Sequence, residues 1–382
     1  MIPFNKPYLS GKEIHYIFQA VYSQGHIAGN GKYTKLCHSF FQNKYNFEKC
    51  LLTTSCTDAL EMAALLLDIK EGDEVIMPAF TFVSTANAFV LRGAKIRFCD
   101  SYPDNPNMDA NKISSLINTN TKAIVVVHYA GVSCDMTKIM ELSTLHNVPV
   151  IEDAAQAIDS FFNERPLGGI GDLSAFSFHE TKNIISGEGG MLVVNNPKLA
   201  QRAEIIWEKG TNRSAFFRGE VDKYGWVDKG SSFLPSEIIA AFLFAQLESM
   251  SSIQKKRLSL WNQYNLHLPQ LAKLYNFRTP SLPSYATNNA HMYFLVCNSQ
   301  DERTELISHL KKNKIHSVFH YQSLQKSAFF TKTNAVYDLE HSDRYSHCLL
   351  RLPLFYELEI ENVDDICASI KDFYQTFNSA VA

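Results

Sequence analysis

Seven short runs of apolar, β-prone residues between positions 50 and 194 constrain the fold more than any other feature of this sequence. In chain order the runs read CLLTT, EVIMP, KIRFC, AIVVVH, PVIED, SAFSF and GMLVV, with helical stretches between them. Strands that are apolar throughout need helices on both faces of their sheet. The pattern therefore predicts an α/β fold with a mostly parallel sheet flanked by helices.

The segments outside this region predict further elements. Ser10 and Glu13 fit a capping box, and apolar residues at helical spacing predict an amphipathic helix over residues 11–23. Residues 205–235 combine glycines, aromatic residues and cations, which predicts a long functional surface loop. Mixed strands and helices follow, so we expect a large domain over residues 1–250 and a smaller α+β domain over residues 251–382.

Composition excludes several classes of partner. The chain has 382 residues, 46% of them hydrophobic, and a formal net charge of −3. Such a charge gives no overall field for nucleic acid or an anionic membrane, so an anionic small molecule must be held by local groups. We find no signal peptide and no run long enough to span a bilayer. Eight cysteines without a CxxC pair favour reduced thiols and a cytoplasmic protein.

Two residues at strand ends predict the chemistry. The run VPVIED ends at Asp153, and the carboxyl ends of parallel strands are where ligands bind in open α/β sheets. Taken alone, Asp153 could simply cap a helix. Lys182 lies 29 positions later (182 − 153), at the end of another strand. A lysine that forms a Schiff base and an acid that keeps a pyridine nitrogen protonated are what pyridoxal phosphate (PLP) needs.

A phosphate site is predicted at the start of one helix. Ser55, Cys56 and Thr57 come directly before the apolar face of TDALEMAALLL, where backbone N–H groups and hydroxyls would meet a phosphate. Simple N-capping by Thr57 is the alternative. A carboxylate facing a phosphate would repel it, so we expect Asp58 to point away. Ser177, five residues before Lys182, is a second hydroxyl candidate.

Other candidates leave two interpretations open. Phe82, just past a strand, is either a core residue or stacks on the cofactor ring. The cations Arg213, Arg218 and Lys223 are either a solvated face or contacts for substrate phosphates. The remaining candidates lack metal-ligand spacing and are structural or substrate-contacting histidines: His128, His291 and His320.

The order of the motifs resembles a known family. FSFHETKN followed by GEGG, with IEDAAQA and TSCTDALEMAALLL upstream, is similar to the DegT/StrS sugar-nucleotide aminotransferases, which are fold type I PLP enzymes. Further runs, among them MPAFTFVSTANAFVLRGAKI, VHYAGVSCDM and RLPLFY, resemble one subgroup nearly end to end. That likeness implies amino transfer from L-glutamate to carbon 4 of dTDP-4-keto-6-deoxyglucose, which gives dTDP-4-amino-4,6-dideoxygalactose for the enterobacterial common antigen.

The resemblance also implies roles for individual residues. Lys182 would form the Schiff base, Asp153 would pair with the pyridinium nitrogen, and Gln156 would bind the phenolic oxygen of the ring. Phe82 would stack on the ring. The phosphate would be held by Ser55, Cys56, Thr57 and Ser177.

Family members are typically homodimers in which a partner loop completes each site. Where many of them have an asparagine that reaches the phosphate, this chain has Ser232, which is shorter, so a bridging water would replace the direct contact. We expect the sugar diphosphate to meet Arg213 or Arg218 of the partner loop, with His320 and Tyr321 of the small domain.

Alternative functions remain to be compared. Relatives that dehydrate the sugar carry histidine in place of the lysine, so Lys182 argues against that chemistry. A non-catalytic PLP-fold sensor or scaffold would not need the complete set of Asp153, Gln156, Ser177 and Lys182. A nicotinamide dehydrogenase is disfavoured because GGIGD at 168–172 lacks the third glycine of the fingerprint. No motif distinguishes the galacto product from its gluco epimer, dTDP-viosamine, or excludes another nucleotide-linked keto sugar.

Overall fold

A seven-stranded sheet forms the centre of the computed structural model, which describes residues 1–381. In spatial order its strands are β1 (Lys49–Thr53), β9 (Gly190–Val194), β8 (Leu173–Ser177), β5 (Val150–Asp153), β4 (Thr121–Val127), β2 (Glu74–Pro78) and β3 (Lys95–Cys99). The pairs from β8 to β3 are parallel, whereas β9 is antiparallel to both β8 and β1. The mostly parallel sheet predicted from the apolar runs is confirmed.

Helices cover both faces of this sheet because successive strand residues point in opposite directions. Ile124 and Val126 of β4 belong to one hydrophobic cluster, and Ala123 and Val125 belong to the other. The first cluster includes residues of α2 (Lys32–Tyr45), α6 (Met136–His146) and α9 (Glu237–Glu248). The second includes residues of α3 (Cys56–Leu66), α4 (Val83–Val90) and α7 (Pro197–Trp207).

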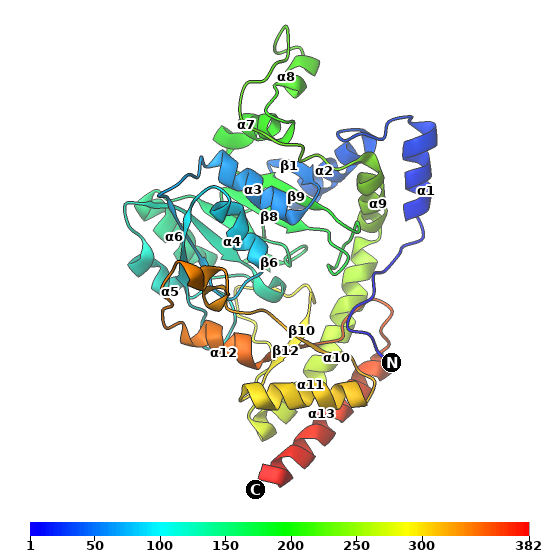
Figure 1. The fold of residues 1–382 in the computed structure, drawn as a ribbon. Helices are drawn as coiled ribbons and strands as arrows, with labels where there is room; N and C mark the ends of the chain where they lie inside the picture. The colour runs from blue at the N-terminus through cyan, green and yellow to red at the C-terminus, as the bar shows by residue number, and fades with distance from the viewer. Residues whose placement is uncertain (382) are drawn as a thin grey trace.

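A second, three-stranded sheet lies beside the chain's long helix (Figure 1). It is antiparallel, in the order β10 (Tyr293–Val296), β12 (Leu349–Leu352) and β11 (Val318–Phe319). Its helices are α10 (Met250–Tyr275), α11 (Gln300–Lys312), α12 (Glu340–Cys348) and α13 (Ile360–Val381). Met250 and Ile253 of α10 pack in the core of the large sheet, whereas Leu260 packs in the core of the small sheet. Because α10 takes part in both cores, the domain boundary at residue 250 stays a prediction.

The predicted N-terminal helix is present: α1 (Glu13–Phe18) continues as a π-helical turn (Gln19–Ser23), and the Glu13 carboxylate accepts the Ser10 backbone N–H as a capping box requires. Its apolar face is divided, because Ile17 packs against the large core, whereas Ile14 is 76% exposed and Phe18 is 56% exposed. Another prediction needs correction. The segment 205–235 is not all loop: α7 ends at Trp207, and α8 (Arg213–Phe217) extends from the body of the molecule (Figure 1).

The GGIGD segment has a structural role. The backbone N–H groups of Gly168, Ile170 and Gly171 donate to the buried Glu152 carboxylate at 2.7, 2.8 and 2.6 Å. His128 Nε2 lies 3.0 Å from the same carboxylate. The Cys134 backbone N–H donates to His128 Nδ1 at 3.2 Å, so this nitrogen is unprotonated and the neutral ring donates from Nε2 to the carboxylate. The segment therefore binds a carboxylate of its own chain, and a hydrogen-bonded histidine–carboxylate pair is buried under β5.

Within residues 1–381, no helix combines the length and the apolar character that a membrane crossing requires.

The buried pair generates a stability prediction. Glu152→Gln removes the negative charge that His128 and three N–H groups share, so we expect the free energy of unfolding to fall by about 3–5 kcal/mol. Urea denaturation followed by circular dichroism measures the change, with Glu141→Gln, an exposed position on α6, as the control. Equal midpoints for the two variants would contradict the proposed role of the pair.

The same comparison carries a pH dependence. Burial would raise the pKa of the Glu152 carboxyl, but the hydrogen bonds from His128 and from the glycine N–H groups lower it below its usual value of 4.5. The stabilisation is therefore complete above pH 4.5 and is lost as the pH falls, so the stability difference between wild type and Glu152→Gln should be larger at pH 7 than at pH 4. An equal difference at the two pH values would contradict an ionised Glu152 in the folded state.

Candidate active site

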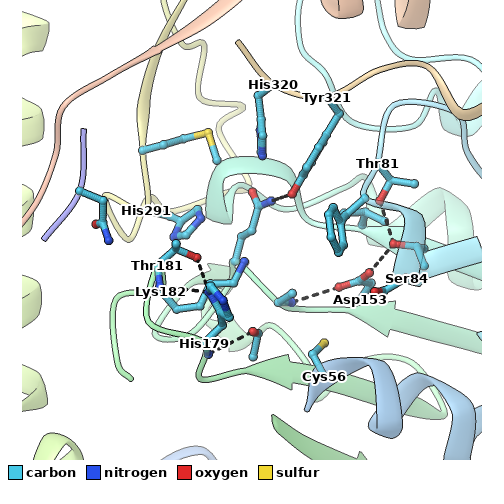
Figure 2. A pocket seen from close by; sticks show the side chains of 18 of the residues that line it. Cys56, Thr81, Ser84, Asp153, His179, Thr181, Lys182, His291, His320 and Tyr321 are labelled. Atoms are coloured by element: carbon cyan, nitrogen blue, oxygen red, sulfur yellow. Dashed lines mark hydrogen bonds between the residues drawn. The ribbon is translucent and has the colours of Figure 1, made fainter. Parts of the chain in front are cut away.

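One cavity of about 540 Å³ collects most of the predicted site residues. Its floor lies at the carboxyl edge of the large sheet, its roof comes from the small domain, and Phe4 and Asn5 of the N-terminal segment close one side. The predicted residues that line it are Ser55, Cys56, Thr57, Phe82, Asp153, Gln156, Ser177, Lys182, His320 and Tyr321. Figure 2 shows the polar groups that converge there.

Asp153 is the last residue of β5 and is buried. Thr85 on α4 donates its hydroxyl to Asp153 Oδ2 at 2.7 Å, and the Ala155 N–H donates to Oδ1 at 3.2 Å. Burial raises the pKa of the Asp153 carboxyl, and these hydrogen bonds and the nearby Lys182 only partly offset this effect. A cation placed against this carboxylate would restore its ionised form. The site is therefore suited to a protonated ring nitrogen.

Lys182 lies in the turn between β8 and β9, where its backbone N–H donates to the His179 carbonyl at 2.9 Å. Burial lowers the pKa of the Lys182 amine, although Cys56 and Asp153 act in the opposite direction. A lowered pKa increases the fraction of neutral amine, which is the form that acts as a nucleophile and a base. Figure 2 shows the lysine and Asp153 facing the same space.

The residue after the lysine holds the turn in place. Asn183 is buried and donates to Gln254 Oε1 at 2.9 Å and to the Asn289 carbonyl at 2.8 Å. Its Oδ1 lies 2.9 Å from Nδ1 of His291, a histidine whose pKa burial lowers well below the usual value. A neutral His291 then donates to Asn183 from Nδ1. These contacts anchor the turn from which the Lys182 amine enters the cavity.

The start of α3 supplies groups for an anion. Ser55 caps this helix by accepting the Asp58 N–H at 3.1 Å, and Thr57 Oγ1 donates to Ser84 Oγ at 2.8 Å. The Asp58 carboxylate accepts the Thr54 hydroxyl and does not line the cavity, as the sequence predicted. The unpaired N–H groups of a helix start, with adjacent hydroxyls, form an anion site.

A glycine allows β9 to approach this helix start. A Cβ atom at Gly190 would overlap the backbone of Ser55 and Cys56. Gly190 is paired with Ser177 of β8, which brings the Ser177 hydroxyl to the same end of the cavity. The glycines that follow Lys182 therefore include one that the close packing of strand and helix requires.

The wall opposite the lysine is polar and aromatic. Gln156 accepts the Ala130 N–H at 2.6 Å and donates to the Tyr321 hydroxyl at 3.1 Å. Phe82 is 54% exposed, so the core alternative is wrong for this residue, and its ring centroid lies 5.9 Å from that of Tyr321. Anion donors, a buried carboxylate, a lysine of lowered pKa and an exposed ring in one cavity fit PLP. Within residues 1–381, no cluster of His, Cys, Asp and Glu could hold a metal ion.

Three predicted residues lie elsewhere. Arg213, Arg218 and Ser232 line a second cavity, beside the start of α2, and none of them lines the Lys182 cavity of the same chain. Arg218 pairs with Glu204 at 2.9 Å and with Glu220 at 2.6 Å. Their contact with the site of a partner subunit stays a prediction.

Sequence reasoning missed several lining residues. Thr85 and Ser84 follow Phe82 in the quoted run TFVSTANAF, and a hydroxyl-rich helix start after a strand could have indicated them. Arg257 and Arg351 come from a helix and a strand of the small domain, and no local motif marked either one.

Comparisons with known proteins agree with this geometry. Residues 9–371 match the DegT/DnrJ/EryC1/StrS aminotransferase family. The chain is 30% identical to GDP-perosamine synthase of Escherichia coli O157:H7 over 377 residues, 98% of each chain. It is 29% identical to the spore coat polysaccharide biosynthesis protein SpsC of Bacillus subtilis, over 97% of this chain and 96% of that protein.

Solved structures show the same fold. The aminotransferase TlmJ from Streptoalloteichus hindustanus has a TM-score of 0.90 at 26% identity, over 99% of this chain and 100% of that one. DesV of S. venezuelae has a TM-score of 0.88 at 25% identity, over 98% of both chains. With a complete lysine and carboxylate site and a family match along nearly its whole length, the chain belongs to the DegT/DnrJ/EryC1/StrS family and is a PLP-dependent sugar aminotransferase.

Proposed function

We propose that this aminotransferase moves the amino group of L-glutamate to carbon 4 of dTDP-4-keto-6-deoxyglucose, forming dTDP-4-amino-4,6-dideoxygalactose and 2-oxoglutarate. The observation that carries the transamination is the meeting of Lys182 and the buried Asp153 in one cavity. The sugar rests on the subgroup resemblance of the sequence, and the similarity to a protein named GDP-perosamine synthase supports a nucleotide-linked sugar. A surface polysaccharide, such as the enterobacterial common antigen, would be the destination of the product.

The cofactor contacts follow from the cavity. Cys56 and Thr57 would bind the phosphate through backbone N–H groups, and Ser55, Thr57 and Ser177 would add hydroxyls. Asp153 would hold the ring nitrogen protonated, and Gln156 would reach the phenolic oxygen.

Lys182 carries the proton transfers in this proposal. PLP, when bound, supplies a ring that accepts negative charge from the reacting carbon. The Lys182 amine, whose pKa burial lowers, would remove the proton from the α-carbon of the donor and pass it to the cofactor. In the sugar half-reaction it would return a proton to carbon 4, the planar ketone carbon that thereby gains its configuration. Enclosure between two domains excludes water, which would otherwise hydrolyse the bound intermediates.

The sugar would lie against the roof of the cavity. His320 Nδ1 is 2.9 Å from the Tyr129 hydroxyl, and burial lowers the pKa of His320 well below its usual value, so the ring is neutral. Tyr321 is held by Gln156. Two neutral hydrogen-bonding rings suit the hydroxyls of a hexose. The face that the sugar presents decides between the galacto product and its gluco epimer.

A second copy of the chain would complete each site. Large apolar side chains are exposed on α1, around α8 and in the loop after it, among them Phe18, Phe217 and Trp226, the last of them 84% exposed. Patches of this kind mark protein interfaces. Ser232, Arg213 and Arg218 lie in the second cavity near this surface, from which they could reach the partner's site. All eight cysteines are free thiols, which fits the cytoplasm.

The phosphate contact predicts the effect of one methyl group. Gly190→Ala would push the start of α3 away from β9, so we expect the Kd for PLP to rise at least about ten-fold. Titration of the apoprotein with PLP, followed by absorbance, measures the affinity. Gly225→Ala, where nothing lies within 4 Å of the added atom, is the control and should bind PLP like wild type. Unchanged binding by both variants would argue against a phosphate at this helix start.

The reaction itself is tested with dTDP-4-keto-6-deoxyglucose and L-glutamate. We expect wild type to form an amino sugar whose carbon 4 has the galacto configuration by NMR, with ping-pong kinetics. Lys182→Ala should lose turnover, because no other group replaces the amine, while exposed Lys198→Ala keeps it. Substantial turnover by Lys182→Ala would overturn the assignment.

Other results would favour the alternatives. An equatorial amine at carbon 4 would identify the gluco epimer. A cofactor absorbance band that glutamate does not change, in a protein that binds PLP, would favour a sensor or scaffold.

A further inference from the structure

His291 lines the active-site cavity, yet no step of the proposed reaction uses it. Its backbone is fixed on both sides: the His291 N–H donates to Asn289 Oδ1 at 3.0 Å, and the His291 carbonyl accepts Nη2 of Arg257 at 2.9 Å. Asn289 in turn donates to the backbone carbonyls of Gln156 and Ile158, both at 2.8 Å. The imidazole therefore has a fixed place beside the large domain.

Hydrogen bonds decide which nitrogen of the ring carries the proton. Asn183 uses both hydrogens of its amide, one for Gln254 Oε1 at 2.9 Å and one for the Asn289 carbonyl at 2.8 Å. Its Oδ1 can therefore only accept, and Nδ1 of His291 lies 2.9 Å from it. Burial, more than any charge, lowers the pKa of His291 well below its usual value, so the ring is neutral. The proton is on Nδ1, and Nε2 keeps its lone pair.

Nε2 of His291 and the amine of Lys182 are complementary groups. Both residues line the same cavity, and within residues 1–381 neither nitrogen has a hydrogen-bond partner. Nε2 can only accept a hydrogen bond, whereas an amine always has N–H groups to donate. Polar groups that stay unpaired in an enclosed site cost free energy, so a contact between these two is favourable.

Electrostatics place the amine near the ring. The charge of Lys182 lowers the pKa of His291 more than the charge of Arg257 does. Arg257 is itself close, because its guanidinium contacts the His291 carbonyl at 2.9 Å. Figure 2 shows the ring and Lys182 on the same side of the cavity. The flexible four-carbon stem of the lysine can therefore bring its amine to Nε2.

We propose that His291 is a positioning residue whose Nε2 accepts a hydrogen bond from the Lys182 amine whenever this amine is not bonded to the cofactor. The inference rests on the proton transfers proposed for Lys182. An amine that donates one N–H to a fixed acceptor has its lone pair turned in a defined direction, which keeps the base aligned with the reacting carbon. The protonated amine would keep the same contact, because an ammonium also donates.

A hydroxyl of the sugar is the other group that Nε2 could accept. The amine is favoured because Asn183, the residue that follows Lys182 in the chain, also holds Nδ1 of His291, so one residue anchors both the ring and the lysine turn. The roof of the cavity has its own groups for hydroxyls, His320 and Tyr321. The two roles differ in one consequence: Lys182 serves both half-reactions, whereas a sugar hydroxyl is present in only one.

Two substitutions separate the roles of the two ring nitrogens. His291→Asn places an amide nitrogen near the position of Nδ1, so it can keep the bond to Asn183, but it leaves the position of Nε2 empty. His291→Gln is long enough to place an amide oxygen near the position of Nε2, but it loses the bond to Asn183. A purely structural histidine would tolerate asparagine better than glutamine, and the proposed role requires the reverse.

Single-turnover absorbance of the PLP-loaded variants measures the effect. With saturating L-glutamate, His291→Asn should slow the half-reaction at least about ten-fold while the apparent Kd for glutamate changes less than about two-fold. The sugar half-reaction should slow by a similar factor, and His291→Gln should stay within about three-fold of wild type in both. The matched control is His309→Asn, a half-buried histidine on α11 that lies 3.0 Å from the Ser369 carbonyl, does not line the cavity and should leave both rates unchanged.

A second readout needs no catalysis. Nitrogen NMR of the apoprotein with isotope-labelled histidine should show His291 with its proton on Nδ1, its signals being those that disappear in His291→Gln. The Nε2 signal should shift in Lys182→Ala, because the hydrogen bond from the amine is lost. It should stay in place in Lys198→Ala, an exposed position outside the cavity.

The remaining outcomes overturn the inference or separate it from the proposed function. A proton on Nε2, an Nε2 signal that Lys182→Ala leaves unchanged, or wild-type rates in His291→Asn would overturn it. A loss confined to the sugar half-reaction would also overturn it, and would assign Nε2 to a sugar hydroxyl. If wild type reacts with neither glutamate nor the dTDP keto sugar, the proposed function fails, while the NMR comparison still decides the role of His291.

Discussion

Burial of an amine and a carboxylate in the same cavity is the constraint on which the rest of this structure depends. Burial raises the pKa of Asp153 and lowers that of Lys182, so both groups are pushed toward their neutral forms. A cationic ring between them would reverse the first shift and reinforce the second. The two residues therefore need a cofactor of this charge, and they need a scaffold that keeps them in place despite the cost of desolvation.

The scaffold begins one residue before Asp153. Glu152 and Asp153 are neighbours on β5, so their side chains point in opposite directions. Glu152 is fixed by His128 and by three N–H groups of the 168–171 segment, whereas Asp153 is fixed by Thr85 and Ala155. A shift of β5 by one residue would exchange the two carboxylates, and neither would find its donors. The GGIGD segment thus sets the register that brings Asp153 to the cavity.

The sequence could predict those features of the fold and the site that depend on a short local sequence pattern. Apolar runs predicted the sheet, strand ends predicted Asp153, and a hydroxyl-rich helix start predicted Ser55 to Thr57 at the cavity. The partner of Glu152 could not be predicted, because GGIGD and VIED meet only in the folded chain. Arg351 was missed for the same reason: its strand carries no motif, and the cavity forms where two domains meet. The exposure of Phe18 shows a different limit of sequence analysis. The sequence indicates that a helix has an apolar face, but it does not identify the surface that covers this face.

The two sides of the cavity are connected through one amide. Gln156 lies near Asp153 on the large-domain side, yet it accepts the Ala130 N–H and donates to Tyr321 of the small domain. Because Ala130 follows Tyr129, which holds His320, the amide and the roof share one hydrogen-bond network. A movement of the small domain would therefore change the position of Gln156 as well as that of the roof. The hydrogen bonds of Gln156 therefore link the large-domain side of the cavity, which includes Lys182, to the roof formed by His320 and Tyr321.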